Sequence, residues 1–426
     1  MTLTEPWPLP AAWRWRRFDD VARVASNLVS PLEHQEWPHI APNHIEAGTG
    51  RLLPHRTVAA DGVTSAKHMF TPGQVLYSKI RPYLAKVVIA QSDGLCSADM
   101  YPIDTQLEAR FLKWWMLTRE FTCLAAGEQA RTILPKINVR SLNTLPVPVP
   151  PVDEQRRIVD VLEDHLSRLD AGLDQFLSTR HRTSSLRESV LRQELLGRAC
   201  GSERSQHRLP AAGVDDGELQ DLPVGWRWHR LQEVADVVGG VTKDAAKQAD
   251  PNFVEVPYLR VANVQRGRLD LRVISRIRVP PAKLEQLRLQ PGDVLMNEGG
   301  DRDKLGRGWV WSGEVADCIT QNHVFRARPR RDLIHPKLLS WSANTLGGPW
   351  CERNGKQSVN LASISLKRIR LMPVPVPPLE MQDAMVERLE RVHEHSARLA
   401  TAIDAQVARA AGLRRSLLAA AFSGRL

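Results

Sequence analysis

Two stretches of the chain carry apolar residues at alternating steps of three and four, the spacing of a helix that packs against another helix. The first stretch begins at Asp153, where acidic residues and upstream prolines favour a helix N-terminus. The pattern predicts a helix from Asp153 to Leu196, about 66 Å long, and a similar helix 227 residues later. The residues predicted to pair the helices are Ile158, Leu162, Leu169, Phe176, Leu186, Val190, Met385, Leu389, Val392, Leu399, Ile403, Leu413 and Leu417.

One such helix cannot cover its own apolar stripe, so the second helix is its expected partner. We expect antiparallel pairing within the chain, because it relates two similar halves by a pseudo-twofold axis. Several positions of the predicted seam are small or polar, which indicates looser packing than in a leucine zipper. The alternative is two independent helices, each lying on its own domain.

The chain contains an internal duplication. Pro146-Val147-Pro148-Val149-Pro150-Pro151 recurs as Pro373-Val374-Pro375-Val376-Pro377-Pro378, and the offset of 227 holds through both predicted helices. Trp13-Arg14-Trp15 answers Trp226-Arg227-Trp228 at an offset of 213. The back half of each copy therefore keeps a strict register, while the front half has gained or lost residues.

The sequence pattern of each front half predicts a mixture of helices and strands. Val75-Leu76-Tyr77-Ser78 and Asp293-Val294-Leu295-Met296 are expected strands. Later segments with Trp115 and Trp341 are expected helices whose tryptophans lie in a core. The predicted fold is α+β, with two pseudo-twofold-related globular domains separated by an antiparallel coiled coil. The expected divisions are a first domain (1–145), prolines with the first helix (146–200), a linker (201–221), a second domain (222–372), and prolines with the second helix (373–426).

Charge and composition narrow the possible partners. The chain has 58 basic and 48 acidic residues, a formal charge of +10, which favours a polyanion such as DNA. A generally Arg-rich, basic proteome is the alternative explanation. The 5 cysteines lack the spacing of a zinc site or disulfide framework. Without an apolar run of about 18 residues, we expect a cytoplasmic protein that binds no membrane.

The order of variable domain, Pro-Val-Pro-Val-Pro-Pro and long helix, repeated once, resembles the specificity subunit of type I restriction-modification systems. The resemblance spans nearly the whole chain. Its most specific part is the first proline stretch followed by Asp153-Glu154-Gln155-Arg156-Arg157-Ile158. The second copy departs from this pattern, because Met381-Gln382 stands where the family has Glu-Gln.

The resemblance implies that each front half is a target recognition domain that reads one half of a bipartite sequence in double-stranded DNA. It also implies that the paired helices set the spacing of the half-targets and dock two adenine methyltransferase subunits, with restriction subunits as possible further partners. The cofactor S-adenosylmethionine belongs to the methyltransferase subunit, and none is expected on this chain. A freestanding DNA-binding adaptor that recruits another protein is the alternative.

Candidate DNA contacts are polar and basic residues in the front halves. In the second copy the glycine-rich stretch from Asn297 to Gly308 is expected to be a loop between strands, where Arg can contact guanine or phosphate and Asn can contact adenine. A solvated loop with internal ion pairs is the alternative. The candidates are Lys79, Arg81, Tyr83, Lys86, Gln129, Arg131, Asn297, Arg302, Lys304, Arg307, Asn322, Gln357 and Asn360.

Catalytic motifs are missing from the sequence. It contains no Asn-Pro-Pro-Tyr or Asp-Pro-Pro-Tyr motif, no Gly-x-Gly-x-x-Gly loop, no Walker sequence and no Gly-x-Ser-x-Gly elbow. A loose arrangement of Asp293, Glu298 and Lys304 is the nearest to a nuclease site. We therefore expect no catalytic or metal-binding residue in this chain.

Overall fold

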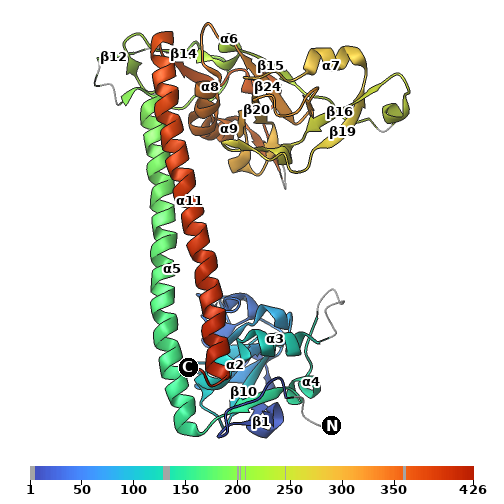
Figure 1. Cartoon of the computed structure of the whole chain (residues 1–426), viewed down its shortest axis with the longest axis vertical. Coiled ribbons are helices and arrows are strands. Elements are labelled where there is room, and N and C mark those ends of the chain that lie inside the picture. The colour runs from blue at the N-terminus through green and yellow to red at the C-terminus, as the bar shows by residue number, and fades with distance from the viewer. Residues whose placement is uncertain are drawn as a thin grey trace. The chain divides into compact units, whose positions relative to one another are not determined.

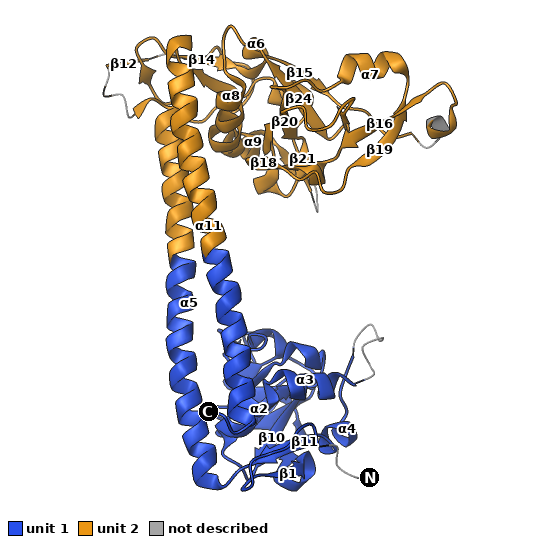
Figure 2. Cartoon of the chain, in the orientation of Figure 1, with its two compact units in different colours: residues 1–178, 403–426 blue, residues 179–402 orange. Residues whose placement is uncertain are grey.

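A computed structural model describes residues 5–127, 135–198, 201, 203–206, 208–244, 246–357 and 361–426 (Figure 1). The chain divides into two compact units, of which the first combines two segments distant in sequence and the second is one continuous segment (Figure 2). Unit 1 comprises Met1–Ser178 and Ile403–Leu426, and unit 2 comprises Thr179–Ala402. Both units contain helices and antiparallel sheets, so the predicted α+β class is confirmed.

The two long helices are present. Helix α5 spans Val152–Leu195 and helix α11 spans Leu379–Phe422, each 44 residues long and 227 positions apart. Their bounds lie one residue before those predicted. Each helix begins directly after its proline stretch, in which the residue before each proline is disfavoured in the helical conformation.

Within each unit, α5 and α11 run in opposite directions. In unit 1, Arg414 near the end of α11 forms an ion pair of 2.7 Å with Asp170 of α5, and Arg157 near the start of α5 donates to the carbonyl of Leu426. In unit 2, Arg388 near the start of α11 contacts Glu194 near the end of α5 at 3.2 Å. The predicted antiparallel sense is therefore confirmed in both units.

The predicted apolar seam is only partly correct. Leu186 and Leu413 are 65% and 50% exposed, although they were expected to pair the helices. Both lie 28 residues after a buried residue, Ile158 and Met385 respectively. A straight helix turns about 20° per heptad away from a strict seven-residue repeat, so after four heptads the stripe points about 80° away.

The other seam candidates fall into three groups by exposure. Phe176 and Leu399 are also exposed, at 38% and 40%. Half-buried candidates are Leu169, Val190, Val392 and Leu417. Buried candidates are Ile158, Leu162, Met385, Leu389 and Ile403. Most of the buried ones belong to the two domain cores, so the middle of the helix pair contributes little apolar packing.

The described residues of unit 1 form a four-stranded and a five-stranded sheet, besides the two-stranded pairing of the proline stretch. The four-stranded sheet has the order β2 (Ala22–Val24), β10 (Met100–Thr105), β7 (Val75–Ser78) and β8 (Val87–Ile89). The five-stranded sheet has the order β3 (Leu28–Val29), β6 (Lys67–Phe70), β9 (Gly94–Cys96), β4 (Pro38–Ile40) and β5 (Arg56–Thr57). The described helices of this domain are α1 (Phe18–Val21), α2 (Ala109–Met116), α3 (Arg119–Ala126) and α4 (Val139–Asn143).

Unit 2 repeats the four-stranded sheet. Its order is β15 (Ala235–Gly239), β24 (Val324–Pro329), β20 (Val294–Asn297) and β22 (Gly308–Val310). A three-stranded sheet has the order β19 (Ser275–Val279), β16 (Val254–Leu259) and β23 (Ile319–Thr320). The helices are α6 (Leu231–Val234), α7 (Pro281–Leu287), α8 (Pro336–Ser342), α9 (Gly348–Asn354) and α10 (Leu366–Ile369).

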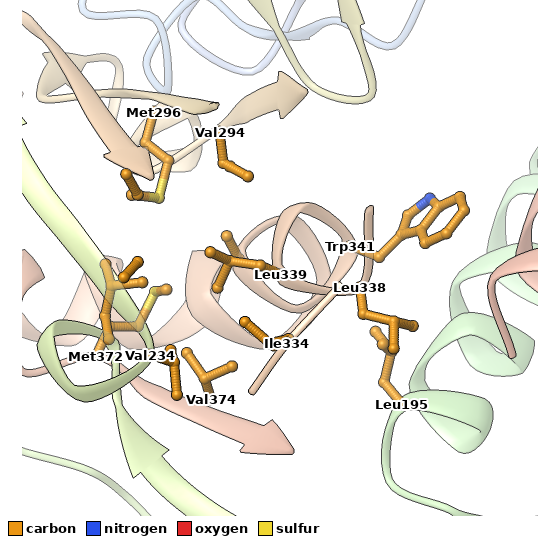
Figure 3. Close-up of a cluster of buried hydrophobic side chains, with 14 of the residues drawn as sticks. Leu195, Val234, Val294, Met296, Ile334, Leu338, Leu339, Trp341, Met372 and Val374 are labelled. Carbon is orange, nitrogen blue, oxygen red and sulfur yellow. The ribbon is translucent and has the colours of Figure 1, made fainter. Parts of the chain in front are cut away.

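The core of unit 2 forms between its sheet, its helices and the end of α5. Figure 3 shows Leu338 and Leu339 of α8 among side chains that include Leu195 of α5. Trp341 is 2% exposed there, and Trp115 is fully buried in the core of unit 1. The prediction that these tryptophans are core residues is confirmed.

The two most conspicuous repeated motifs are strand partners. In unit 1, β1 (Arg14–Arg17) pairs antiparallel with the proline strand β11 (Pro146–Val149). In unit 2, β14 (Arg227–Arg230) pairs in the same way with β27 (Pro373–Val376). Each is a two-stranded sheet, which tolerates proline because the missing N–H groups face no second neighbour.

A glutamine at the start of each long helix ties that helix to its domain. The Gln155 side chain donates to the Pro150 carbonyl at 3.0 Å and accepts from the Glu108 N–H, before α2, at 2.9 Å. Gln382 makes the equivalent bonds to the Pro377 carbonyl, 2.9 Å, and the His335 N–H, 2.6 Å. Both glutamines are almost fully buried, so these bonds are shielded from water.

The departure at Met381 has a structural explanation. Its counterpart Glu154 lies at a partly exposed position and makes a 3.8 Å ion pair with Arg157. Met381 packs instead against the apolar core of unit 2. The residue before the glutamine can therefore vary, whereas the glutamine itself attaches the start of the long helix to its domain.

The end of each long helix packs against the start of the other copy. A side chain at Gly197, just after α5, would overlap Pro223, and one at Gly424, just after α11, would overlap Pro10. Both glycines have positive φ, +61° and +71°, a conformation that ends helices and favours glycine. The same junction thus occurs once in each unit.

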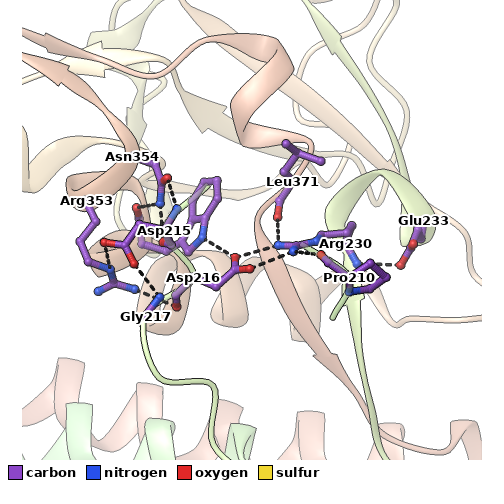
Figure 4. A network of polar contacts seen from close by, with 10 residues as sticks. Pro210, Asp215, Asp216, Gly217, Arg230, Glu233, Arg353, Asn354 and Leu371 are labelled. Carbon is purple, nitrogen blue, oxygen red and sulfur yellow. Dashed lines mark hydrogen bonds and ion pairs between the residues drawn. The ribbon is translucent and has the colours of Figure 1, made fainter. Parts of the chain in front are cut away.

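Part of the predicted linker is bound to unit 2. Asp216 forms a 2.7 Å ion pair with the buried Arg230 and accepts from the Trp350 indole at 3.0 Å (Figure 4). Burial opposes ionisation of Asp216, but these hydrogen bonds outweigh it and hold its pKa below the usual value. Asp215 exchanges two hydrogen bonds with Asn354. The domain boundaries predicted from the sequence remain a prediction.

Replacing the buried glutamine at the start of α5 should destabilise the protein. The Gln155→Ala substitution leaves the Glu108 N–H and the Pro150 carbonyl without partners, which costs about 1–3 kcal/mol. We expect the free energy of unfolding in urea, followed by circular dichroism, to fall by this amount. Gln193→Ala, an exposed glutamine of the same helix, is the control and should change it by less than about 0.5 kcal/mol. Equal effects of the two substitutions would contradict the role of Gln155.

Candidate nucleic-acid interface

The glycine-rich segment of unit 2 joins β20 to β22, as the sequence predicted. A side chain at Gly308 would overlap the Leu295 carbonyl, so the return strand can approach only with glycine there. Gly306 has a φ of +66° and donates to the Asn297 carbonyl at 3.0 Å. The segment is therefore a packed loop with a defined path.

Asn297 is a structural residue, and its predicted DNA contact is wrong. It is fully buried, and its side-chain amide donates to the carbonyls of Val264, 2.8 Å, and Val261, 3.3 Å. These bonds attach the loop to a neighbouring segment of the domain. An asparagine committed in this way cannot reach a base.

The basic residues of the loop differ in their surroundings. Arg302 is exposed and donates to the Glu352 carbonyl at 3.2 Å. Lys304 forms an ion pair with Asp301 inside the loop, which lowers the pKa of that carboxyl group. Arg307 is half-buried, and burial lowers its pKa. The ion pair between Lys304 and Asp301 is the kind of internal pair that the sequence analysis gave as the alternative. The guanidinium groups of Arg302 and Arg307 are therefore better candidates than Lys304 for contact with a phosphate.

A small sheet joins this loop to a second candidate segment. Strand β21 (Gly299–Gly300) pairs with β26 (Ala362–Ser363), which pairs with β25 (Lys356–Gln357). Gln357 and Lys356 are both exposed. The structure therefore brings Gln357 to the same sheet as the loop, and Lys356 is a neighbour that our sequence analysis missed. Asn360 lies outside the described residues.

A polar cluster borders the loop on another side. His323 contacts Glu298 through Nδ1 at 2.7 Å, and its Nε2 lies 3.3 Å from the Asn322 amide. The backbone N–H of Glu298 donates to the His323 carbonyl at 2.9 Å, which fixes the two segments together. Asn322 is half-buried and remains a candidate for DNA contact.

In unit 1 the corresponding loop joins β7 to β8. Arg81 is exposed and has a φ of +48°, a left-handed conformation that is uncommon outside glycine. Tyr83 is 55% exposed, and the Lys79 ammonium lies 5.3 Å from the centre of the Tyr101 ring. Lys86 is half-buried and donates to the Pro42 carbonyl at 2.6 Å, which anchors the loop, and its predicted DNA contact stays a prediction.

The two loops have equivalent backbone partners. Ile80 forms an isolated bridge with Lys136, at positions that correspond to Gly299 and Ser363 in the repeat. Lys136 is exposed and pairs with Asp99 at 3.0 Å. We did not predict this lysine, and its counterpart in the repeat, Ser363, gave no signal of a DNA contact. The candidates Gln129 and Arg131 lie outside the described residues.

The described residues show no cluster for metal chemistry. No group of three or more His, Cys, Asp or Glu side chains in the described ranges could hold a metal ion. Among the helices described, none combines the length and apolar character needed to cross a membrane.

Comparison with known proteins connects this arrangement to one family. The type I restriction modification DNA specificity domain matches residues 223–409. The specificity subunit of the Escherichia coli type I restriction enzyme EcoDI is 46% identical over 199 residues, 47% of this chain and 45% of that protein. The EcoBI specificity subunit of Escherichia coli is 23% identical over 295 residues, 68% of this chain and 60% of that protein. The matched regions thus span about half the length of these curated relatives.

Two solved structures share the fold across the whole chain. One, described as the structural basis of complex assembly and conformational transition of the type I R-M system, aligns with a TM-score of 0.75 and 23% identity over 99% of this chain and 100% of that one. The HsdS subunit from Thermoanaerobacter tengcongensis aligns with a TM-score of 0.52 and 23% identity over 99% of both chains. These findings confirm the resemblance to type I specificity subunits.

The structural role of Asn297 can be separated from DNA reading. Asn297→Ala should lower the melting temperature by several degrees, because the Val264 carbonyl loses a buried donor and the Val261 carbonyl keeps only the Val264 N–H. Asn322→Ala removes an amide whose described contact is with His323 alone, and should leave the melting temperature unchanged. Thermal unfolding followed by circular dichroism measures both. An unchanged melting temperature for Asn297→Ala would show that the buried amide is dispensable.

Proposed function

Because residues 223–409 match the type I restriction modification DNA specificity domain, we propose that this chain is the DNA-recognition and scaffold subunit of a type I restriction-modification complex. Each front domain reads one half of a bipartite target in double-stranded DNA. The long helices set the spacing between the halves and dock methyltransferase subunits. The chain itself is non-catalytic, and S-adenosylmethionine is bound by the methyltransferase.

One observation carries the proposal: the two units share a framework but present different loops. The strand order β2-β10-β7-β8 of unit 1 matches β15-β24-β20-β22 of unit 2. The loop after β7 is short and basic, whereas the loop after β20 is longer and rich in glycine and aspartate. A common framework with unlike loops supports two readers with unlike half-targets.

The length of the long helices sets the separation between the two half-targets. A 44-residue helix is about 66 Å long, or roughly two turns of a DNA duplex. Two readers attached to such helices are expected to contact half-targets separated by a fixed number of base pairs.

Exposed leucines are the proposed docking points for two methyltransferase subunits. Leu186 of α5 and Leu413 of α11 occupy equivalent positions of the repeat, and their exposures are 65% and 50%. Val152 and Leu379, the first residues of the two helices, are also equivalent and are 54% and 50% exposed. Because each exposed residue occurs twice, the surface suits two copies of the same partner. Restriction subunits are further proposed partners.

Exchange of one domain tests the DNA-reading role. Replacing residues 222–372 with the matching domain of a relative should change one half of the methylated sequence and keep the other half. Single-molecule sequencing of the host genome, with and without this gene, identifies methylated adenines for both versions. A change in both halves, or methylation that does not depend on the gene, would falsify the proposal.

Substitution of the exposed leucines tests the docking role. Leu186→Arg and Leu413→Arg should each remove one of two methyltransferase subunits, because a charge opposes burial of an apolar contact. The double variant should lose both subunits. Native mass spectrometry of the co-purified complex counts the subunits.

The control is Ala408→Arg, which adds the same charge at another exposed position of α11. It should retain two subunits. If all three single variants retain both subunits, the docking surface lies elsewhere on the chain.

A further inference from the structure

One arginine recurs in both units but has a different partner in each. Arg187 of α5 and Arg414 of α11 are 227 positions apart. In unit 1, Arg414 forms a 2.7 Å ion pair with Asp170 and donates to the Thr49 carbonyl at 2.9 Å. The repeat position of Asp170 in the second copy is Ala397, which has no charge. The carboxylate that neutralises Arg414 thus has no counterpart beside Arg187.

Arg187 is left with a weak partner. Its Nη2 lies 3.3 Å from Nδ1 of His393, and its buried Nε has no hydrogen-bond partner among the described atoms. Because a guanidinium only donates, this contact requires a neutral His393 with an acceptor at Nδ1. Burial, followed by the charge of Arg187, lowers the pKa of His393 and keeps it neutral. Arg187 therefore lies at a partly buried position with no carboxylate in ion-pair contact among the described residues.

A second arginine adds to this charge. Arg266 lies in the turn between β17 (Val264–Gln265) and β18 (Arg268–Leu269), and it donates to the carbonyls of Asn344 and Asp303. Burial lowers the pKa of Arg187, the charge of Glu188 partly offsets this effect, and the neighbouring charge of Arg266 lowers the pKa further. Neither arginine forms an ion pair with a carboxylate among the described residues. The two guanidinium groups thus lie together without a carboxylate in ion-pair contact among the described residues.

The two arginines line a cavity of about 340 Å³ in unit 2, together with Trp309 and Asn344. Three acidic residues, Glu188, Asp303 and Glu352, line the cavity as well. Glu188 and Asp303 are exposed, so the cavity opens to solvent and these carboxylates are hydrated. A hydrated carboxylate compensates a buried guanidinium poorly.

The cavity adjoins the candidate DNA-reading loop. Asp303, which receives the hydrogen bond from Arg266 at 2.8 Å, belongs to the segment between β20 and β22. Gly267, next to Arg266, has a φ of +73° and lies close to both His393 and Arg187. A ligand bound by the two arginines would therefore lie between the reading loop and the long helices of unit 2.

We propose that Arg187 and Arg266 bind one phosphate of the DNA backbone beside the half-target read by unit 2. The inference rests on the proposed function and adds a residue-level contact to it. Guanidinium groups bind phosphate oxygens through paired, charge-assisted hydrogen bonds. Such contacts set the position of a reader on the duplex without selecting its sequence. The adjoining loop and the basic charge favour DNA over a carboxylate of a partner protein.

The test measures DNA binding by the complete complex at several salt concentrations, after the methylated target has been identified. Arg187→Ala should weaken binding of target and unrelated duplexes by a similar factor, about tenfold. It should also reduce the slope of log K against log salt by about 0.9. Arg187→Lys keeps the charge and should lose less affinity. Arg398→Ala is the control, since it removes an equally charged but 76% exposed side chain of the same unit.

Replacement of single phosphates by methylphosphonates locates the contact. Replacing one particular phosphate beside the unit 2 half-target should weaken DNA binding by the unsubstituted complex. The same replacement should not weaken DNA binding by the Arg187→Ala complex. The phosphate contact is overturned if the losses of binding free energy from Arg187→Ala and from the methylphosphonate add at every phosphate position. It is also overturned if the variant keeps the original salt slope, and in both cases the proposed function stands. Loss of methyltransferase subunits with unchanged DNA binding would also overturn it, in favour of a protein carboxylate. Failure of the unsubstituted complex to bind DNA would instead reject the proposed function.

Inorganic phosphate distinguishes a backbone contact from a free anion. The melting temperatures of the unsubstituted protein and of Arg187→Ala are compared in phosphate and in chloride at equal ionic strength. Stabilisation by phosphate that depends on Arg187 would support an oxyanion site. The same stabilisation together with an unchanged DNA salt slope would mean that a free anion, not DNA, occupies it, and would overturn the proposal.

Discussion

Each long helix completes two hydrophobic cores, and the rest of the structure depends on that sharing. Helix α5 contributes Ile158 and Leu162 to the core of unit 1 and Leu191 and Leu195 to the core of unit 2. No residue of α5 from 167 to 190 is fully buried. A long polar helix is marginally stable in water by itself, so the domains stabilise it as much as it completes them. The proline strands and the buried glutamines then fix where each helix leaves its domain.

The large features could be predicted because they depend on local sequence. The predicted bounds of the long helices differ from the observed ones by one residue, and the strands at Val75 and Val294 lie where short apolar runs predicted them. The seam was less accurate, because a strict heptad was extended through a nearly straight helix. Leu186 illustrates this difference, since its neighbour Arg187 lies closer to α11 and contacts His393.

The candidate interface was harder to predict, because its outcome depends on partners that are distant in sequence. Asn297 resembled a base-reading residue within a glycine-rich loop, but carbonyls more than 30 positions away hold it in the core. Lys86 looked available for DNA and is bound to Pro42. Conversely, Lys136 and Lys356 gave no local signal, and only strand pairing brought them next to the loops. Residue type suggested the chemistry, whereas tertiary contacts decided which side chains remain available.

The glycine–proline junctions bear on how such a chain could have arisen. Gly197 meets Pro223 where the backbone runs on into the second copy, and Gly424 meets Pro10 through the same type of packing without that continuity. The contacts therefore do not require the covalent connection. Two separate half-length polypeptides could form the same pair of junctions as a symmetric dimer, and a later gene fusion would let their recognition loops diverge independently.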